Sequence, residues 1–228
     1  MTLIEKTRKR GPSAKEVVPP LLLGALGSIG VVALYFLVPG FQPIDLVLLL
    51  VAVGFVAVGY TRCVVHGVIT VAILYFATAV AAALYRPLAP YADAVRWFVT
   101  LPLTHDFGGS MDRHVDRDSY AFSFGLVTVI LWIVLEVIFW VSFRDTHLPG
   151  LGVLDNLGGL IIHLVIGALV ASLLFNTIGY GRLRRLHDEA LLRTRLNQVL
   201  YVHFQIAQSF WFPERPPPIY VYDLDVPR

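Results

Sequence analysis

The chain has 228 residues, of which 57% are hydrophobic and only 15% are charged. Its mean hydropathy is +0.70, whereas a soluble domain carries roughly 25% charged residues, so a water-soluble globular protein is excluded. The net charge of +2 gives no indication of a nucleic-acid partner, and the single cysteine excludes an internal disulfide or a thiolate metal cluster. The composition indicates an integral membrane protein whose surface contacts the lipid bilayer.

The N-terminus is basic and is followed by a first apolar span. Residues 1–16 hold all of the lysines of the chain and are predicted to form a charged tail. The apolar span at residues 17–38 is longer than the roughly 7–15 residues of a signal-peptide core, and no small-residue cleavage site follows it. We therefore expect residues 17–42 to form a retained transmembrane helix, with Gly24 and Ser28 on one face for helix packing.

The next apolar run is too long for one crossing. It extends from residue 44 to residue 84 and is interrupted only around Arg62 and His66. A helix needs roughly 20 residues to cross a bilayer. The run is therefore predicted to cross twice, at residues 44–60 and 64–84, with a tight hairpin near Arg62.

The segment at residues 86–119 is predicted to be an acid-rich loop. Imidazole and carboxylate side chains alternate within it and could contact a divalent cation. These weak metal candidates are His105, Asp112, His114 and Asp116. Arginines between them supply counter-charges and no full ligand set is present, so no metal site is predicted. Asp118 and Ser119 are expected to cap the following helix.

The fourth span, at residues 120–143, contains one carboxylate, Glu136. An ionised acid in the middle of a membrane costs about 2.5–3.5 kcal/mol on insertion scales, so Glu136 is predicted to face the bundle. Arg62 is its nearest partner by depth, and His66 and His163 are alternatives. A structural polar contact is the favoured interpretation, and a proton or ion pathway is the second.

The fifth span, at residues 157–179, has a repeat of every fourth residue. Gly159, His163, Gly167 and Ala171 share one helix face. Small residues at this spacing predict a groove that another helix can approach closely. His163 within the groove is a packing residue, a neutral histidine bonded to a neighbouring helix, or an axial ligand to a haem or chlorin. No cofactor is predicted beyond this last alternative.

The C-terminal region is more polar. Residues 181–212 are predicted to form an amphipathic helix in the headgroup layer, with Leu196, Leu200, His203 and Ala207 on its apolar face. Residues 213–228 are proline-rich and are expected to form an extended arm. The predicted fold class is all-α: a polytopic helical membrane protein with about five transmembrane helices plus this amphipathic helix.

The distribution of lysine and arginine predicts the topology. The basic tail places the N-terminus in the cytoplasm, and five crossings then place the C-terminus on the extracytoplasmic side. Arg62 and Arg144 fall on the cytoplasmic side, as the rule requires. The basic run at residues 182–185 falls outside, against the rule. We give more weight to the first helix.

Three short motifs resemble those of the colicin V production (CvpA) family of bacterial inner-membrane proteins. They are an Ile-Asp before an apolar run, a Gly-x-x-Arg hairpin, and a Gly-x-x-Asp-x-x-x-Gly start of the last span. The motif residues are Asp45, Gly59, Arg62, Gly152, Asp155, Gly159 and Gly167. Cys63 stands where the family usually has a glycine after the hairpin arginine. The resemblance implies a four-helix core at residues 43–180.

The resemblance implies a membrane scaffold linked to export, envelope maintenance or stress tolerance, with other membrane subunits as partners. No nucleophile elbow, phosphate-binding glycine loop or HExxH motif is present, so we predict no enzyme. A non-catalytic scaffold or accessory subunit is therefore the first hypothesis. A transporter or channel helper with a polar path at Glu136 and Arg62 is the alternative, and a haem- or pigment-associated subunit is the second alternative.

Overall fold

A computed structural model describes residues 14–104, 115–142, 152–181 and 184–211. These residues form six helices and no strand: α1(Ala14–Leu37), α2(Pro43–Thr104), α3(Arg117–Ser142), α4(Val153–Tyr180), α5(Arg184–Asp188) and α6(Arg193–Trp211). The helices α1 to α4 are long and apolar enough to cross a membrane. The predicted all-α, multi-pass membrane fold is confirmed. The tail at residues 1–13 and the arm at 213–228 lie outside the described residues.

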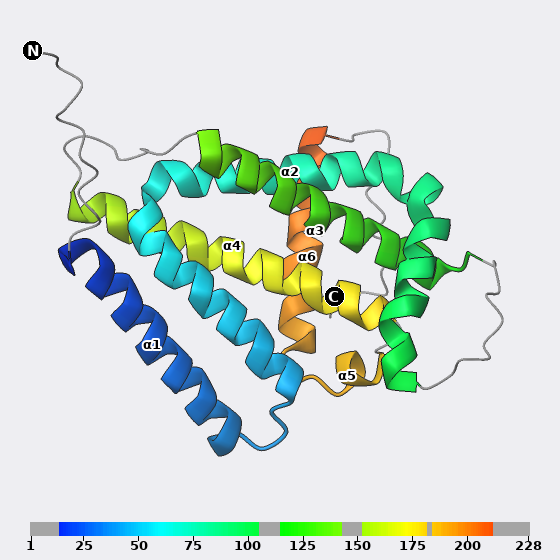
Figure 1. The fold of residues 1–228 in the computed structure, drawn as a ribbon, viewed down its shortest axis with the longest axis horizontal. Helices are drawn as coiled ribbons and strands as arrows, with labels where there is room; N and C mark the ends of the chain where they lie inside the picture. The colour runs from blue at the N-terminus through cyan, green and yellow to red at the C-terminus, as the bar shows by residue number, and fades with distance from the viewer. Residues whose placement is uncertain (1–13, 105–114, 143–151, 182–183, 212–228) are drawn as a thin grey trace, which may run out of the picture.

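The helix α2 accounts for two of the predicted crossings. Its helical geometry breaks at one residue, Cys63, where φ is 61° and ψ is 177°. The first segment of α2 (residues 43–62) and the second segment of α2 (residues 64–104) leave this break in different directions (Figure 1). The predicted hairpin near Arg62 is therefore a one-residue break in an otherwise continuous helix.

The second segment of α2 is longer than expected. Residues 86–104 were predicted to be loop, but they continue the helix to Thr104. Figure 1 shows that the last turns of α2 bend away from the main direction of the segment. The sequence of this part of the helix contains Pro87 and Pro90. Ala89 and Ala92 are buried, so packing on one face of the helix outweighs the proline and charge signals that predicted a loop.

The helix α4 lies at the centre of the molecule. It runs between the two segments of α2, with α3 and α6 also close to it (Figure 1). Half of its most apolar stretch is buried, compared with 6% for α1. A core cluster joins α2, α3, α4 and α6 through Leu74, Phe124, Leu173, Leu200 and Phe204. The helix α1 lies along the first segment of α2 at the edge of the bundle (Figure 1).

The C-terminal helix differs from the prediction for residues 181–212. Two helices, α5 and α6, replace the single predicted one. The apolar face of α6 does not rest in the headgroup layer, because Leu196, Leu200, His203 and Ala207 are buried inside the protein. The Ser172 hydroxyl of α4 also donates to the Leu196 carbonyl. A protein core and a membrane surface require the same apolar stripe, so the sequence pattern could not distinguish them.

Candidate functional site

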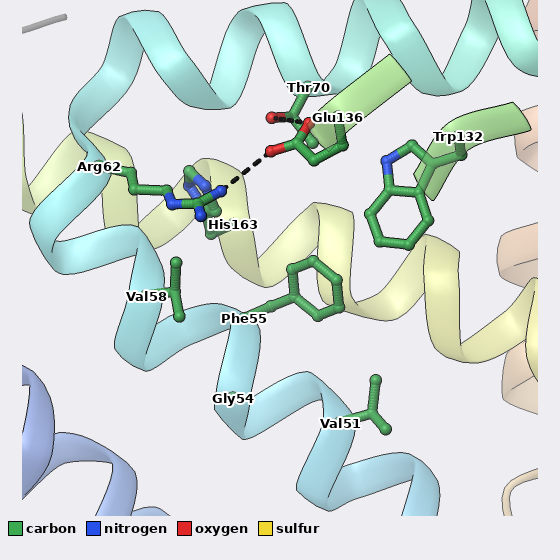
Figure 2. A pocket seen from close by; sticks show the side chains of 9 residues that line it. All are labelled: Val51, Gly54, Phe55, Val58, Arg62, Thr70, Trp132, Glu136 and His163. Carbon is green, nitrogen blue, oxygen red and sulfur yellow. Dashed lines mark hydrogen bonds and ion pairs between the residues drawn. The ribbon is translucent and has the colours of Figure 1, made fainter. Parts of the chain in front are cut away.

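The carboxylate of Glu136 is the centre of a polar cluster between α2 and α3. The Arg62 Nη1 donates to Glu136 Oε1 at 3.0 Å, and His66 Nε2 lies 3.0 Å from the same oxygen. The Thr70 hydroxyl donates to Glu136 Oε2 at 3.0 Å. Figure 2 shows Arg62 and Thr70 approaching the carboxylate from α2. Both carboxylate oxygens are therefore hydrogen-bonded.

These partners come from regularly spaced positions. His66 and Thr70 are four residues apart in the second segment of α2, so they lie on one face of it. Arg62 comes from the end of the first segment, on the other side of the Cys63 break. The side chain of Arg62 is 31% exposed and that of Glu136 is 15% exposed. The structure brings together Arg62, His66 and Glu136 and adds Thr70, which sequence reasoning missed. The sequence feature that could have identified Thr70 is its spacing of four residues from His66.

His163 of α4 lies beside this cluster. Its ring stacks on that of His66, with centroids 6.1 Å apart and planes at 13°. Its Nδ1 donates to the Gly159 carbonyl at 2.9 Å, because a carbonyl only accepts. Its Nε2 is buried without a partner among the described residues. Nε2 is then the nitrogen left for any ligand, and the haem or chlorin alternative stays a prediction.

The family-motif residues meet at the break in α2. The Val64 amide, freed where the helix is interrupted, donates to Asp155 Oδ1 at 3.0 Å. A Cβ added to Gly159, one turn further along α4, would lie 2.5 Å from the Gly59 carbonyl oxygen and 2.7 Å from the Cys63 Cα. Only a glycine fits there, since backbone atoms cannot move aside. Thus Gly59 and Gly159 allow α4 to contact the break, and Asp155 accepts from the Val64 amide that the break leaves without a helical partner.

The break itself is strained. Cys63 has a backbone conformation that is essentially confined to glycine and costs other residues about 1–3 kcal/mol. Its thiol donates to the Asn156 side-chain carbonyl at 3.3 Å. This strained position is also where the family usually has glycine. The departure from the motif therefore has a physical cost.

The predicted packing groove of α4 contacts α2. A Cβ on Gly167 would lie 3.1 Å from both the Ala52 Cα and the Phe55 Cβ, and Ala171 is buried. On α1 the closest approach occurs at Gly27, where an added Cβ would be 2.7 Å from Val53 Cγ1.

The packing residues predicted on α1 are less tightly placed. A Cβ on Gly24 would be at an ordinary 3.4 Å from the Ala57 Cβ, and Ser28 is half-buried. The contact between α1 and α2 is therefore tightest beside the predicted pair and not at it. Gly152, before α4, has a positive φ of 47° and no atom within 4 Å of an added Cβ, so its role is conformational.

Asp45 joins the two ends of the core. Its side chain is fully buried. It accepts hydrogen bonds from the Gln42 amide at the start of α2 and from the Leu191 and Leu192 amides before α6, each at 3.0 Å. One carboxylate therefore caps its own helix and holds the start of a helix far along the chain.

Among the predicted metal candidates, His105, Asp112 and His114 lie outside the described residues. Asp116 accepts from the Ser119 amide at 2.6 Å and from Arg96 Nη1 at 3.4 Å, so it caps α3 in place of the predicted Asp118 and Ser119. Burial of the Asp116 carboxyl opposes ionisation, but the bonds from Ser119 and the charge of Arg96 lower its pKa. In the described ranges, no three His, Cys, Asp or Glu side chains gather into a metal-binding group.

A cavity of about 360 Å³ adjoins the polar cluster. Figure 2 shows its wall, with Arg62 and Glu136 at one end and Val51 at the other. The lining residues are Val51, Gly54, Phe55, Val58, Arg62, Thr70, Trp132, Glu136 and His163. Trp132 packs on Phe55 with ring centroids 5.8 Å apart. Trp132 was not singled out from the sequence, because the chain offers no pattern that separates it from other interfacial aromatic residues.

Comparison with known families agrees with this geometry. The family model described as colicin V production protein matches residues 44–200, more than half of the chain. The chain belongs to the colicin V production protein family. The match includes every motif residue and continues through α5 into α6, while α1 precedes it. No curated protein matched the chain, and no solved structure did.

Proposed function

We propose that this member of the colicin V production family is a non-catalytic scaffold or accessory subunit of a larger bacterial inner-membrane assembly. The observation that carries the proposal is the use of its buried carboxylates. Asp45, Glu136 and Asp155 each accept hydrogen bonds that connect two elements of the bundle. We call these three residues the carboxylate joints.

The carboxylate joints favour structure over chemistry. A catalytic acid or a proton relay needs an oxygen that substrate or water can reach. The oxygens of Glu136 accept from Arg62 and Thr70, with His66 Nε2 also 3.0 Å from Oε1, and Asp45 accepts from three backbone amides. Their hydrogen bonds hold helices in fixed positions, which suits a protein whose task is to present a rigid surface.

The helix α1 is the surface that we assign to partner subunits. It contacts the rest of the bundle along α2, and its outward side chains are large and apolar. Leu22, Leu26 and Ile29 are all more than half exposed. Because α1 precedes the region that the family model matches, it supplies a contact surface beyond the family core. We place the N-terminus in the cytoplasm and the C-terminus on the extracytoplasmic side, on the basic tail.

Gentle detergent extraction followed by mass spectrometry of co-purifying chains tests the proposal. We expect partner membrane proteins with the wild-type chain, and their loss when Leu22, Leu26 and Ile29 of α1 are replaced by alanine. The matched control replaces Ile130, Val134 and Ile138, residues of α3 that are about half exposed, by alanine. A wild-type chain that purifies alone, or equal losses in both variants, would contradict the proposal.

A transporter or channel helper is the second candidate, because Glu136 and Arg62 line a cavity. This candidate predicts that Glu136→Gln abolishes a proton-dependent flux in vesicles while the protein still folds. No flux in the wild type, or an unchanged flux in the variant, removes it. The haem or pigment alternative is tested by the absorption spectrum of the purified native protein, which would be colourless under the scaffold proposal.

A further inference from the structure

The cavity beside Glu136 runs from a charged end to an apolar end. Arg62 lies at the break of α2, and Val58, Phe55 and Val51 follow at successive turns of the first segment of α2 (Figure 2). Residues 51 and 62 are about 16 Å apart along a helix axis. Half of the hydrocarbon thickness of a bilayer is about 15 Å. The cavity is therefore about as long as one leaflet is deep.

Three polar groups in the wall have no complete set of protein partners within the part of the chain that the structure describes. His163 is only 2% exposed, and its Nε2 is unpartnered. Since its Nδ1 donates to Gly159, the neutral ring presents Nε2 as an acceptor. The Trp132 Nε1–H is an unpartnered donor. Arg62 uses its Nη1 toward Glu136 and His66, and its side chain is partly exposed.

These groups define the chemistry of a ligand. Arg62 is paired with the Glu136 carboxylate through Nη1, and its remaining N–H groups can donate to a second acceptor at the end of the cavity. Trp132 lies one helical turn before Glu136 on α3 and calls for an acceptor deeper in the leaflet. His163 calls for an N–H or O–H donor. The remaining wall is apolar and calls for a hydrocarbon chain.

We propose that this cavity binds a glycerophospholipid of the surrounding leaflet. Its phosphate lies at Arg62, its ester carbonyl accepts from Trp132, and one acyl chain lies along Val58, Phe55 and Val51. A headgroup N–H or O–H donates to the Nε2 of His163. Basic pockets between transmembrane helices bind lipid headgroups in this manner.

The position of the cavity favours a lipid over other occupants. Its rim is exposed at Gly54 and Val58, on a membrane-spanning segment that a lipid reaches by lateral diffusion. An inorganic phosphate would satisfy Arg62 but leave the apolar wall empty. A helix from a partner chain would fill the wall but supply no phosphate oxygen for the remaining N–H groups of Arg62. A phospholipid satisfies both ends.

Gly54 provides a variant that blocks the cavity without disturbing the fold. A Cβ at Gly54 would have no atom within 4 Å, and Gly54 lines the cavity. Gly54→Leu therefore fills the slot with its own side chain. Gly30→Leu is the matched control, because Gly30 of α1 also has no atom within 4 Å of an added Cβ and lies outside the cavity. Both changes replace a helical glycine by leucine, so their effects on helix propensity are equal.

The first measurement is the phospholipid retained by the full chain after purification in mild detergent, determined by native mass spectrometry. We expect a stoichiometric phospholipid on the wild type and on Gly30→Leu, and its loss from Gly54→Leu. Equal retention by the two variants would overturn the proposal. The proposal would also be overturned if a protein segment could be cross-linked to residue 54 while no lipid is bound, because a protein would then occupy the cavity.

The second measurement is the thermal midpoint of delipidated protein after transfer to nanodiscs of defined composition. Phosphatidylethanolamine and phosphatidylglycerol have headgroup donors, and phosphatidylcholine has none. We expect the first two to raise the midpoint of the wild type and of Gly30→Leu by several degrees more than phosphatidylcholine does. Gly54→Leu should show no difference among the three lipids. Equal midpoints for the wild type in all three lipids, or a rise with inorganic phosphate alone in detergent, would contradict the assignment.

Discussion

The helices α1 and α4 are nearly equal in hydropathy but differ in what surrounds them. Their most apolar stretches have mean hydropathies of 2.1 and 2.4, yet 6% of the first is buried in the protein and 50% of the second. The helix α4 carries Asp155 and closely packed glycines, whereas residues 18–37 of α1 contain no carboxylate. Hydropathy therefore determines that a helix enters the membrane, and small and polar residues determine what it packs against.

The largest expected effect contrasts glycines of these two helices. Gly167→Leu on α4 forces a side chain against the backbone of Ala52 and should destabilise the protein by about 3 kcal/mol. Gly27→Leu on α1 meets the side chain of Val53, and α1 can shift at the edge of the bundle, so we expect about 1 kcal/mol. Thermal unfolding in detergent measures both.

Two conservative changes are controls for this contrast. Leu164→Val alters an exposed residue of α4 and should be nearly silent. Leu173 is on a different face of α4 from Gly167, which suggests that Leu173→Val would be a silent control. It is not, because Leu173 is buried in the core. If Gly27→Leu proves as damaging as Gly167→Leu, α1 is held as firmly as α4 and the comparison fails.

A second prediction concerns the carboxylate joint at Asp45. Asp45→Ala removes the acceptor for the Leu191 and Leu192 amides and for the Gln42 amide, and should cost about 2 kcal/mol. Glu189→Ala, which breaks an exposed pair with Arg185, should cost less than about 0.5 kcal/mol. Chemical unfolding in detergent compares them, and equal losses would show that Asp45 is dispensable to the fold.

A third prediction is a pH dependence at α6. Burial lowers the pKa of His203 to about 4, and its Nε2 donates to the Thr78 hydroxyl. The neutral ring is favoured in the folded state, so its contribution is complete above the ordinary pKa of about 6.5 and is lost as the pH falls toward 4. At pH 5 we expect a loss on the order of 1–2 kcal/mol.

His203→Gln supplies the control for this pH dependence. Glutamine can still donate to Thr78 but does not titrate. The difference in thermal midpoint between wild type and variant should therefore change between pH 7 and pH 5. A difference that is the same at both pH values would contradict the prediction, because it would show that folding does not lower the pKa of His203.

The smallest expected effect is a gain. Cys63→Gly relieves a backbone conformation that costs about 1–3 kcal/mol, and part of this is offset by the greater freedom of glycine in the unfolded chain. We expect a net stabilisation of about 1 kcal/mol, measured by thermal unfolding. Cys63→Ala keeps the Cβ and should give no such gain. If Cys63→Ala stabilises the protein as much as Cys63→Gly does, the stabilisation comes from removing the thiol and not from relieving the backbone conformation.

Sequence reasoning predicted the features that follow from the residue type and its spacing along one helix. The cost of a carboxylate in lipid indicated that Glu136 needs partners. The small residues at every fourth position of α4 indicated that Gly159 and Gly167 face another helix. Sequence reasoning could not predict the hydrogen bonds from the Leu191 and Leu192 amides to Asp45, because these donors are 146 and 147 residues away along the chain. It also missed the helical continuation beyond residue 84, where packing of Ala89 and Ala92 overrides two prolines.

The hydrogen bonds of Asp45 have a consequence for the order of assembly during synthesis. The acid is made and buried near the beginning of the family core, while the amides that it accepts are made close to its end. Until Leu191 and Leu192 emerge, the Asp45 carboxylate can accept from the Gln42 amide but lacks the two later amides that it accepts from in the finished fold. The contact at Asp45 therefore forms late in synthesis, and a nascent chain that stops short of residue 191 leaves this carboxylate without two of its hydrogen bonds.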